Sequence, residues 1–458
     1  MSRKSSSIKF LVFSYVFIVF FLSISFYSRI GISGVNELGS ISPKLDSEIQ
    51  RMMEEGGIPS IQAGIVIQDE LIWAKDYGSP SGLESVYMVA SISKTITATV
   101  FLQLYERNLI DLNEDINSYL PFEVRHPSYP TTEITFRMLL AHESGLNRYF
   151  YYSDNYAYDN DVLEWGNEAL GTNYTIWSYH PTLEEFLHGS FTPSGPYYSP
   201  DIWEWRPGLR FLYSSAGYLL LEYLVECITN QTFAMYVQEN IWDPLGMTSS
   251  GYNANDFVDV TATPFERIGG ISIELPIYNY NNLAAGGLRT TVSDLAKFMI
   301  AHMNQGESNG YQLLKAESVE SMHQTQNIFG GKEVGNLYWA GYGLGWSLYT
   351  QGIQGHSGSL PGYGCHMLYN ESDAGSYGII TITNLNSAWE QEWNWLDDYY
   401  GTIRDMIFDE AASIFDEPAS LFNPFPLALL LIGVISIAAV VIIIVRYKFF
   451  RKSRTKSD

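Results

Sequence analysis

The spacing of apolar residues along the chain predicts a helix, then a hairpin, then a largely helical middle. Residues 43–56 follow Ser42, begin with a proline and end in glycine, which predicts a helix of about three turns. Residues 60–78 hold two apolar, β-branched runs around Gln68-Asp69-Glu70, a pattern typical of a β-hairpin. From Ser91 to about residue 250 the period is helical. The run that begins at Ser91 is amphipathic, with Ile92, Ile96 and Val100 on one stripe, and further helices are expected near 182–188 and 216–228.

Strand-like patterns return in the last third of the chain. They cover residues 342–350, 364–370 and 376–386, and residues 389–415 then predict a long C-terminal helix. Strands from both ends with helices between them indicate one sheet formed by the two ends, with a helical region packed beside it. The predicted fold class is α+β, with sites in the groove between sheet and helices. Residues 149–205, rich in Tyr and Trp, are either a long loop beside a binding cleft or a packed surface insertion.

Both ends of the chain carry long uncharged segments. Residues 10–28 follow three basic residues, which fits a secretory signal or an uncleaved signal anchor. Residues 427–445 are mostly aliphatic and long enough for a transmembrane helix, and the basic run directly after them marks the cytoplasmic side. The predicted organisation is an N-terminal signal or signal-anchor segment (1–39), an extracellular domain (40–416), a transmembrane helix (427–445) and a cytoplasmic tail (446–458).

Composition limits the partners of this chain. Its 458 residues are 46% hydrophobic, enough for a large core, and its two cysteines, Cys227 and Cys365, provide no disulfide framework, although they leave one pairing open. The formal net charge of −24 argues against nucleic acid and favours a solvated surface outside the cell. The predicted partners are a small-molecule or peptide substrate and, through the uncharged segments, a lipid bilayer.

Ser91 and Lys94 lie between the predicted hairpin and the start of a predicted helix. Three residues make almost one helical turn, so the hydroxyl and the amine project from the same face. A serine hydroxyl is a poor nucleophile until its proton is taken, and a partly desolvated lysine can lose its charge and help to take it. The helix N-terminus favours a developing oxyanion. The alternative is an N-cap serine beside a solvated lysine.

Two further motifs support the catalytic interpretation. Tyr213-Ser214-Ser215 lies in a loop before an apolar helix, and His356-Ser357-Gly358 lies at the entry to a strand. With Ser91-x-x-Lys94 these are the three elements, in order, of the penicillin-recognising serine hydrolases. From about residue 43 to 410 the chain resembles the class C β-lactamase-related family, which includes penicillin-binding proteins, D-alanyl-D-alanine carboxypeptidases, D-aminopeptidases, esterases and LACTB-like proteins. Further motifs of that family occur at 139–146, 242–247 and 284–299.

The resemblance implies a β-lactamase/transpeptidase-like fold with an antiparallel sheet, and a role for each motif residue. Ser91 would be acylated, Lys94 would assist, and Tyr213 would carry the proton between Ser91 and the leaving group. The backbone N–H groups of Ser91 and Ser359 would form the oxyanion hole. No metal or organic cofactor is implied. Residues expected to contact the substrate are Ser215, His356, Ser357 and Gly358, whereas His142 of the 139–146 motif is expected to be structural.

Two departures from the family pattern affect the expected substrate. Ser215 stands where class C β-lactamases have the Asn of Tyr-x-Asn, so a shorter hydroxyl replaces an amide that would grip a substrate carbonyl. His356 stands where β-lactamases have the Lys of K-T-G, and histidine is mostly uncharged near neutral pH. A substrate carboxylate would therefore be held less firmly, and efficient β-lactamase activity is not expected.

The sequence thus predicts a membrane-anchored extracellular serine hydrolase, a peptidase or esterase that works through an acyl-enzyme. One alternative is a surface binding or sensory module on an inactive hydrolase fold, with Trp203 or Trp205 of the aromatic stretch at the ligand surface. Another alternative is a true β-lactamase or penicillin-binding enzyme.

Overall fold

The computed structural model describes residues 41–78, 82–147, 156–334, 337–372, 374–386 and 397–416. The described residues up to Ala411 belong to one compact unit, and residues 412–416 are the described part of a second. The uncharged segments at 10–28 and 427–445 lie outside the described residues. Within the described ranges, no helix is both long and apolar enough to span a bilayer.

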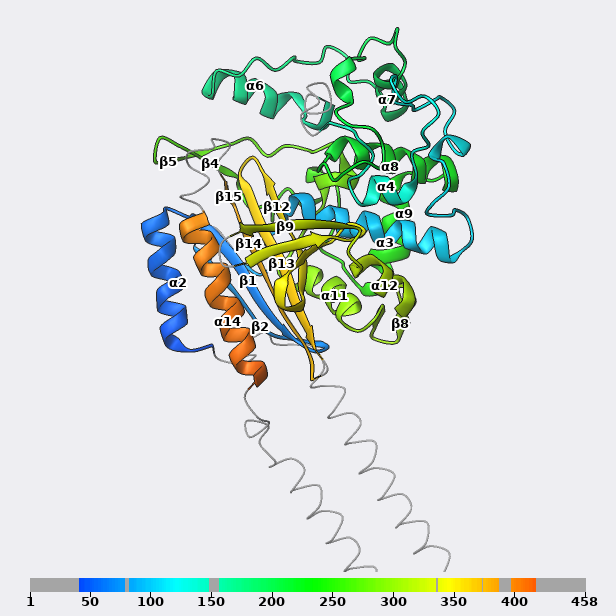
Figure 1. Cartoon of the computed structure of the whole chain (residues 1–458). Coiled ribbons are helices and arrows are strands. Elements are labelled where there is room, and N and C mark those ends of the chain that lie inside the picture. Colours follow the sequence, from blue (N-terminus) through cyan, green and yellow to red (C-terminus); the bar gives the residue numbers. More distant parts are fainter. Residues whose placement is uncertain are drawn as a thin grey trace, which may run out of the picture. The chain divides into compact units, whose positions relative to one another are not determined.

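An eight-stranded antiparallel sheet forms the centre of the first unit, and both parts of the chain that were expected to supply strands contribute to it (Figure 1). Its strand order is β2-β1-β14-β13-β12-β11-β10-β9, so the N-terminal hairpin pairs directly with the last long strand. This arrangement confirms the predicted α+β class and the antiparallel sheet. The strands are β1 (Ser60–Ile67), β2 (Glu70–Gly78), β9 (Asn327–Val334), β10 (Leu337–Tyr342), β11 (Ser347–Tyr349), β12 (Ile353–Leu360), β13 (Tyr363–Ser372) and β14 (Gly375–Thr383).

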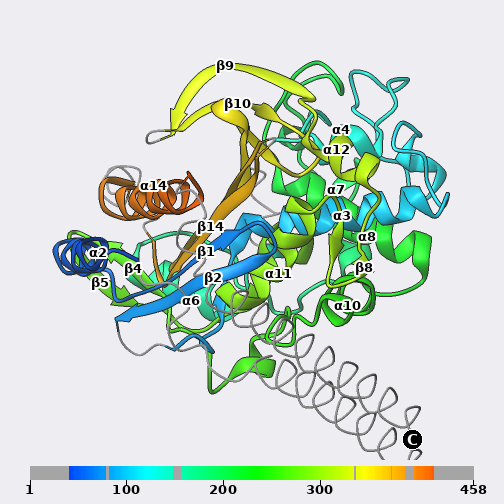
Figure 2. The ribbon, with the colours of Figure 1, turned by 90° about the horizontal axis from the view of Figure 1, so that it is seen from below.

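Helices cover both faces of the sheet (Figure 2). On one face lie α2 (Pro43–Gly56), with Ser42 as its N-cap, and α14 (Thr402–Asp416), where Phe408 packs on Tyr377 of β14. On the other face α11 (Val292–Met303) packs closely, because a side chain at Gly64 of β1 would lie 2.6 Å from a methyl group of Val292. The expected helix at 389–415 is shorter in the described residues: a π-helical turn, η8 (Asp397–Gly401), leads into α14, and residues 389–396 are not described.

The helical region is built around α3 (Ser93–Glu106), which is buried on every side from Ser93 to Leu104. The sequence pattern predicted an amphipathic helix here, and that prediction is wrong. Three of the buried polar residues of this helix are threonines, and their hydroxyls donate to backbone carbonyls: Thr95 to Ile92 at 2.8 Å and Thr97 to Ala284 at 2.7 Å, with Thr99 bonded to Thr95 at 3.0 Å. Satisfied hydroxyls can be buried at little cost, so this helix has no solvated face between Ser93 and Leu104.

The remaining elements surround α3 and close the unit. The described residues of the stretch 149–205 hold helices rather than one long loop. The strand expected at 342–350 is interrupted, because Tyr342 ends β10, residues 343–346 are not in a strand, and residues 347–349 form β11. The helices are α4 (Phe136–Leu140), α6 (Asn160–Ala169), α7 (Leu183–Phe191), α8 (Ser215–Thr229), α9 (Phe233–Val237), α10 (Asp243–Leu245) and α12 (Ala316–His323). The short strands are β3 (Tyr87–Met88), β4 (Phe265–Ile268), β5 (Ile271–Glu274), β6 (Arg289–Thr290), β7 (Glu307–Ser308), β8 (Tyr311–Gln312) and β15 (Leu385–Asn386).

Candidate active site

Ser91 lies in a single 3₁₀ turn, η1 (Ala90–Ile92), that leads directly into α3. Its neighbour Ala90 has φ of +46°, a left-handed conformation that a residue with a side chain adopts only when its surroundings enforce it. Ser93 enforces it from one side, because its hydroxyl donates to the Ala90 carbonyl at 2.7 Å and accepts the Leu288 N–H at 3.1 Å. The turn therefore holds Ser91 in a fixed orientation at the N-terminal end of α3.

Lys94 lies one turn later and is completely buried. Its Nζ donates to Ser91 Oγ at 3.1 Å and to the backbone carbonyl of Ala285 at 2.7 Å. The same amine lies 5.0 Å from the ring centroid of Tyr213 and 5.3 Å from that of Tyr218. The expected pairing of hydroxyl and amine is present, and the alternative of a solvated lysine is wrong.

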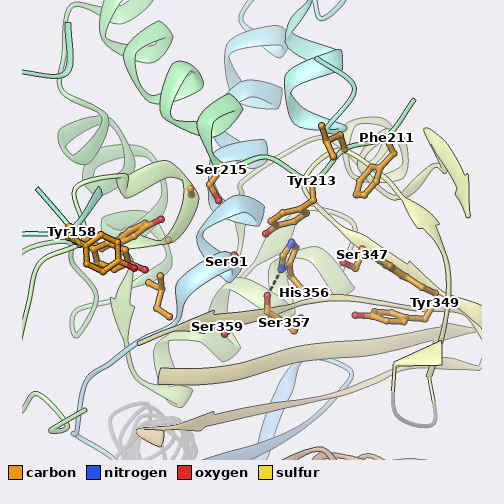
Figure 3. Close-up of a pocket in the computed structure, with 17 residues that line it drawn as sticks. Ser91, Tyr158, Phe211, Tyr213, Ser215, Ser347, Tyr349, His356, Ser357 and Ser359 are labelled. Carbon is orange, nitrogen blue, oxygen red and sulfur yellow. Dashed lines mark hydrogen bonds between the residues drawn. The ribbon is translucent and has the colours of Figure 1, made fainter. Parts of the chain in front are cut away.

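The loop that carries Tyr213 is held by His142. The backbone N–H of Leu212 donates to the His142 carbonyl at 2.7 Å, and the N–H of Ser214 donates to His142 Nδ1 at 3.1 Å. The His142 ring also packs on the Tyr213 ring, with centroids 4.3 Å apart. Figure 3 shows the Tyr213 hydroxyl on the side of its ring that faces Ser91. These contacts agree with a structural role for His142, which fixes the position of the phenol.

The sheet strand β12 supplies the opposite wall through His356. Its Nδ1 lies 2.5 Å from the Ser357 carbonyl, drawn as the dashed line in Figure 3, and Nε2 lies 3.0 Å from the Tyr342 hydroxyl. A carbonyl only accepts, so Nδ1 carries the proton and Nε2 accepts from Tyr342. Burial, together with the charge of Lys94, lowers the pKa of His356 to about 3. The ring is therefore neutral, and both nitrogens are engaged by the protein.

Gly358 allows β12 to approach the nucleophile turn. A Cβ at this position would lie 2.3 Å from the Val89 carbonyl oxygen and 2.5 Å from the sulfur of Cys365. The position therefore faces η1 rather than the substrate space, which differs from the substrate contact expected for Gly358. On the next residue, Ser359 Oγ accepts from Asn386 Nδ2 at 2.7 Å. Cys365 and Cys227 are both free thiols.

These elements border a cavity of about 660 Å³. Six of the predicted site residues line it: Ser91, Tyr213, Ser215, His356, Ser357 and Ser359. Lys94 lies beneath Ser91, and the backbone N–H groups proposed as the oxyanion hole belong to two of the lining residues. The sequence did not predict Tyr342 as the partner of His356. It also did not predict the contact of Lys94 with the Ala285 carbonyl, although Ala285 lies in the 284–299 motif.

Trp203 is not part of this cavity. It is buried, and its ring centroid lies 5.2 Å from that of His126 and 5.8 Å from that of Phe191. The aromatic stretch instead contributes Tyr158 and Tyr174 to the lining. The stretch is thus a packed insertion rather than one long loop, and it also borders the cavity, but Trp203 does not line that cavity.

A buried carboxyl supports the segment that contacts Lys94. Glu222 of α8 accepts the backbone N–H of Ala284 at 3.0 Å, within the short π-helical segment η6 (Leu283–Gly287). The next residue of η6, Ala285, provides the carbonyl that binds Lys94 Nζ. Burial raises the pKa of Glu222 from 4.5 to about 8, although the backbone N–H groups of η6 act in the opposite direction. Glu222 is thus connected to Ser91 only indirectly, through η6 and Lys94.

This raised pKa predicts a pH dependence of stability. Between pH 4.5 and about 8 the unfolded chain loses a proton that folded Glu222 keeps, so the free energy of unfolding should fall as pH rises through that window. The slope from this one group is at most about 1.4 kcal/mol per pH unit. Glu222→Gln removes the titration and should flatten the profile measured by urea unfolding at pH 5 and pH 8. The exposed Glu320→Gln is the matched control, and an unchanged slope in Glu222→Gln would contradict the prediction.

Comparisons with known proteins point to one family. A family model described as Beta-lactamase matches residues 45–397. Protein flp of Staphylococcus aureus strain MRSA252 is 23% identical over 355 residues, which cover 76% of this chain. The chain spans 63% of the length of that relative.

Solved structures share the fold at low sequence identity. A penicillin-binding protein homologue from Pyrococcus abyssi is similar with a TM-score of 0.62 and 24% identity, over 74% of this chain and 73% of that one. D-amino acid amidase from Ochrobactrum anthropi SV3 is similar with a TM-score of 0.59 and 18% identity, over 80% and 99%. Because the family model covers most of the chain and the sheet, η1 and α3 have the arrangement described above, the chain belongs to the beta-lactamase family of hydrolases.

Proposed function

We propose that the protein is a serine hydrolase that cleaves an amide, peptide or ester bond through an acyl-enzyme on Ser91. The observation that carries this proposal is the 3.1 Å contact between Lys94 Nζ and Ser91 Oγ at the edge of an open cavity. A buried amine beside a hydroxyl is the arrangement that activates a weak nucleophile. The amidase with the same fold supports an amide or a related acyl substrate, without fixing which one.

In the first step Ser91 Oγ attacks the substrate carbonyl carbon while its proton passes to an uncharged Lys94 amine. The backbone N–H groups of Ser91 and Ser359 stabilise the oxyanion, because donors fixed in advance need no reorganisation as charge develops. Tyr213, held over Lys94, passes the proton to the leaving group, which departs and leaves the acyl-enzyme. Water then attacks the ester on Ser91, and the same groups act in reverse.

We also propose that the hydrolase domain faces the outside of the cell and is held at the membrane. The support is the sequence pattern, namely the uncharged segments at 10–28 and 427–445 and the basic run after the second. The strongly acidic composition of the chain fits an exposed, solvated domain.

A covalent probe tests the proposed function. Intact mass of the full chain after exposure to a fluorophosphonate should show one adduct, and peptide mapping should place it on Ser91, because only an activated serine reacts rapidly. Exposure to a penicillin should give no stable adduct, since His356 cannot hold the carboxylate. An adduct-free, folded protein would favour the binding-module alternative, and a stable penicillin adduct would favour a penicillin-binding enzyme.

A further inference from the structure

Aromatic side chains form two walls of the cavity, one on each side of Ser91. In Figure 3 Tyr158 lies on one side of Ser91, and Phe211 and Tyr349 lie on the other. Tyr174 and Tyr280 line the same cavity, as does Trp339. A substrate whose carbonyl carbon reaches Ser91 therefore meets aromatic surface on both sides of the bond that breaks.

Both walls are ordered by contacts within the protein. Tyr158 and Tyr280 meet edge to face with ring centroids 5.1 Å apart, and Phe211 and Trp339 do so at 6.0 Å. A Cβ at Gly286 would lie 2.9 Å from the Tyr280 ring, so this ring packs directly on the backbone of η6. Walls that exist before the substrate arrives lose little entropy on binding, which favours flat apolar groups.

The cavity offers little to balance a substrate charge. Among the described lining residues there is no Asp, Glu, Lys or Arg. His356 occupies the position at which relatives with a K-T-G motif have a cation, but its ring is neutral and its nitrogens are engaged by Ser357 and Tyr342. An ionised group moved from water into such surroundings loses hydration without gaining a partner.

We infer that the substrate is an uncharged acyl compound, an ester or amide with aromatic or other apolar groups on both sides of the scissile bond. A compound that places a free carboxylate or ammonium group inside the cavity is excluded. This inference rests on the proposed function and deepens it by naming the substrate class. Tyr158 and Tyr280 contact the group on one side, and Phe211 and Trp339 contact the group on the other.

Matched p-nitrophenyl esters test this inference on the full chain. The 3-phenylpropanoate ester is neutral, whereas 3-(4-carboxyphenyl)propanoate and 3-(4-aminomethylphenyl)propanoate add only one charge. We expect kcat/KM for the neutral ester to exceed that for each charged ester by about 100-fold, because the charge stays unpaired in the cavity. Equal or faster cleavage of either charged ester would overturn the inference.

A variant provides a second, independent readout. His356→Lys introduces a cation into the lining and should raise the ratio of carboxylated to neutral ester cleavage by about 10-fold, since the carboxylate gains a partner. Because this ratio is measured within each protein, it does not depend on how much enzyme folds. Tyr105→Ala, at an exposed position on α3, should leave the ratio at its wild-type value. An unchanged ratio in His356→Lys would overturn the inference.

The p-nitrophenyl acetate ester and the fluorophosphonate separate this inference from the proposed function. If Ser91 takes the adduct and the acetate is cleaved, but charge makes no difference, only the inference fails. If there is no adduct and no ester is cleaved, the proposed function fails and the inference fails with it.

Discussion

Replacing Ser91 with alanine should lower kcat for ester cleavage by at least about 10⁴-fold and abolish the fluorophosphonate adduct. The substitution removes the only atom that forms the acyl bond in the proposed mechanism. The fold should be unaffected, because Ser91 is partly exposed and Lys94 Nζ retains its contact with the Ala285 carbonyl. Rates of p-nitrophenyl acetate cleavage measure the loss of activity, and intact mass measures the loss of the adduct.

The control for this prediction is Ser249→Ala. Ser249 is also partly exposed, lies outside the cavity lining, and offers its backbone N–H rather than its hydroxyl to Asp294. This variant should keep the wild-type rate and the adduct. Turnover that survives in a folded Ser91→Ala protein would mean that the nucleophile is another residue.

Local spacing made part of the site predictable. The three-residue step from Ser91 to Lys94 sets both side chains on one face of a helical turn, whatever the rest of the fold does. One sheet formed by both ends of the chain, with a helical region beside it, followed from the strand patterns, whereas the antiparallel arrangement was implied by the resemblance to the family. The neutral state of His356 also followed from residue type, and its burial strengthens that expectation.

Contacts between distant parts of the chain were not predictable in the same way. Lys94 donates to a backbone carbonyl 191 residues later in the chain. Every residue has such a carbonyl, so the residue type does not indicate this contact. Glu222 resembles any other acidic residue on a helix until the burial of α8 against η6 is known. The pattern of α3 gave the wrong prediction of a solvated polar face because a threonine counts as polar. Its hydroxyl can instead donate to a carbonyl of the helix backbone and then be buried.

Aromatic residues were ambiguous for a different physical reason. The same ring can fill a core or line a cavity, and only packing decides between them. Trp203 fills the core beside His126, while Tyr158, from the same stretch, faces the cavity. Sequence therefore indicated that the aromatic stretch matters but not which rings would meet a ligand.

Replacing Lys94 with methionine should lower kcat/KM by about 10³-fold, the contribution typical of a positioned general base, and slow the fluorophosphonate reaction. Methionine is of similar length and apolar, so thermal unfolding should stay close to that of the wild type, since a buried amine costs free energy to desolvate. Activity and stability are thus expected to separate in this variant.

Lys94→Arg distinguishes a base from a fixed positive charge. A guanidinium stays charged and cannot accept the Ser91 proton, so the base role predicts that this variant is as inactive as Lys94→Met. If Lys94 acted only by electrostatic attraction, a folded Lys94→Arg protein would retain most of its activity. If folded Lys94→Met keeps the wild-type rate, the lysine is structural and another group takes the proton of Ser91, with Tyr213, which lies over Lys94 and lines the cavity, as the first candidate.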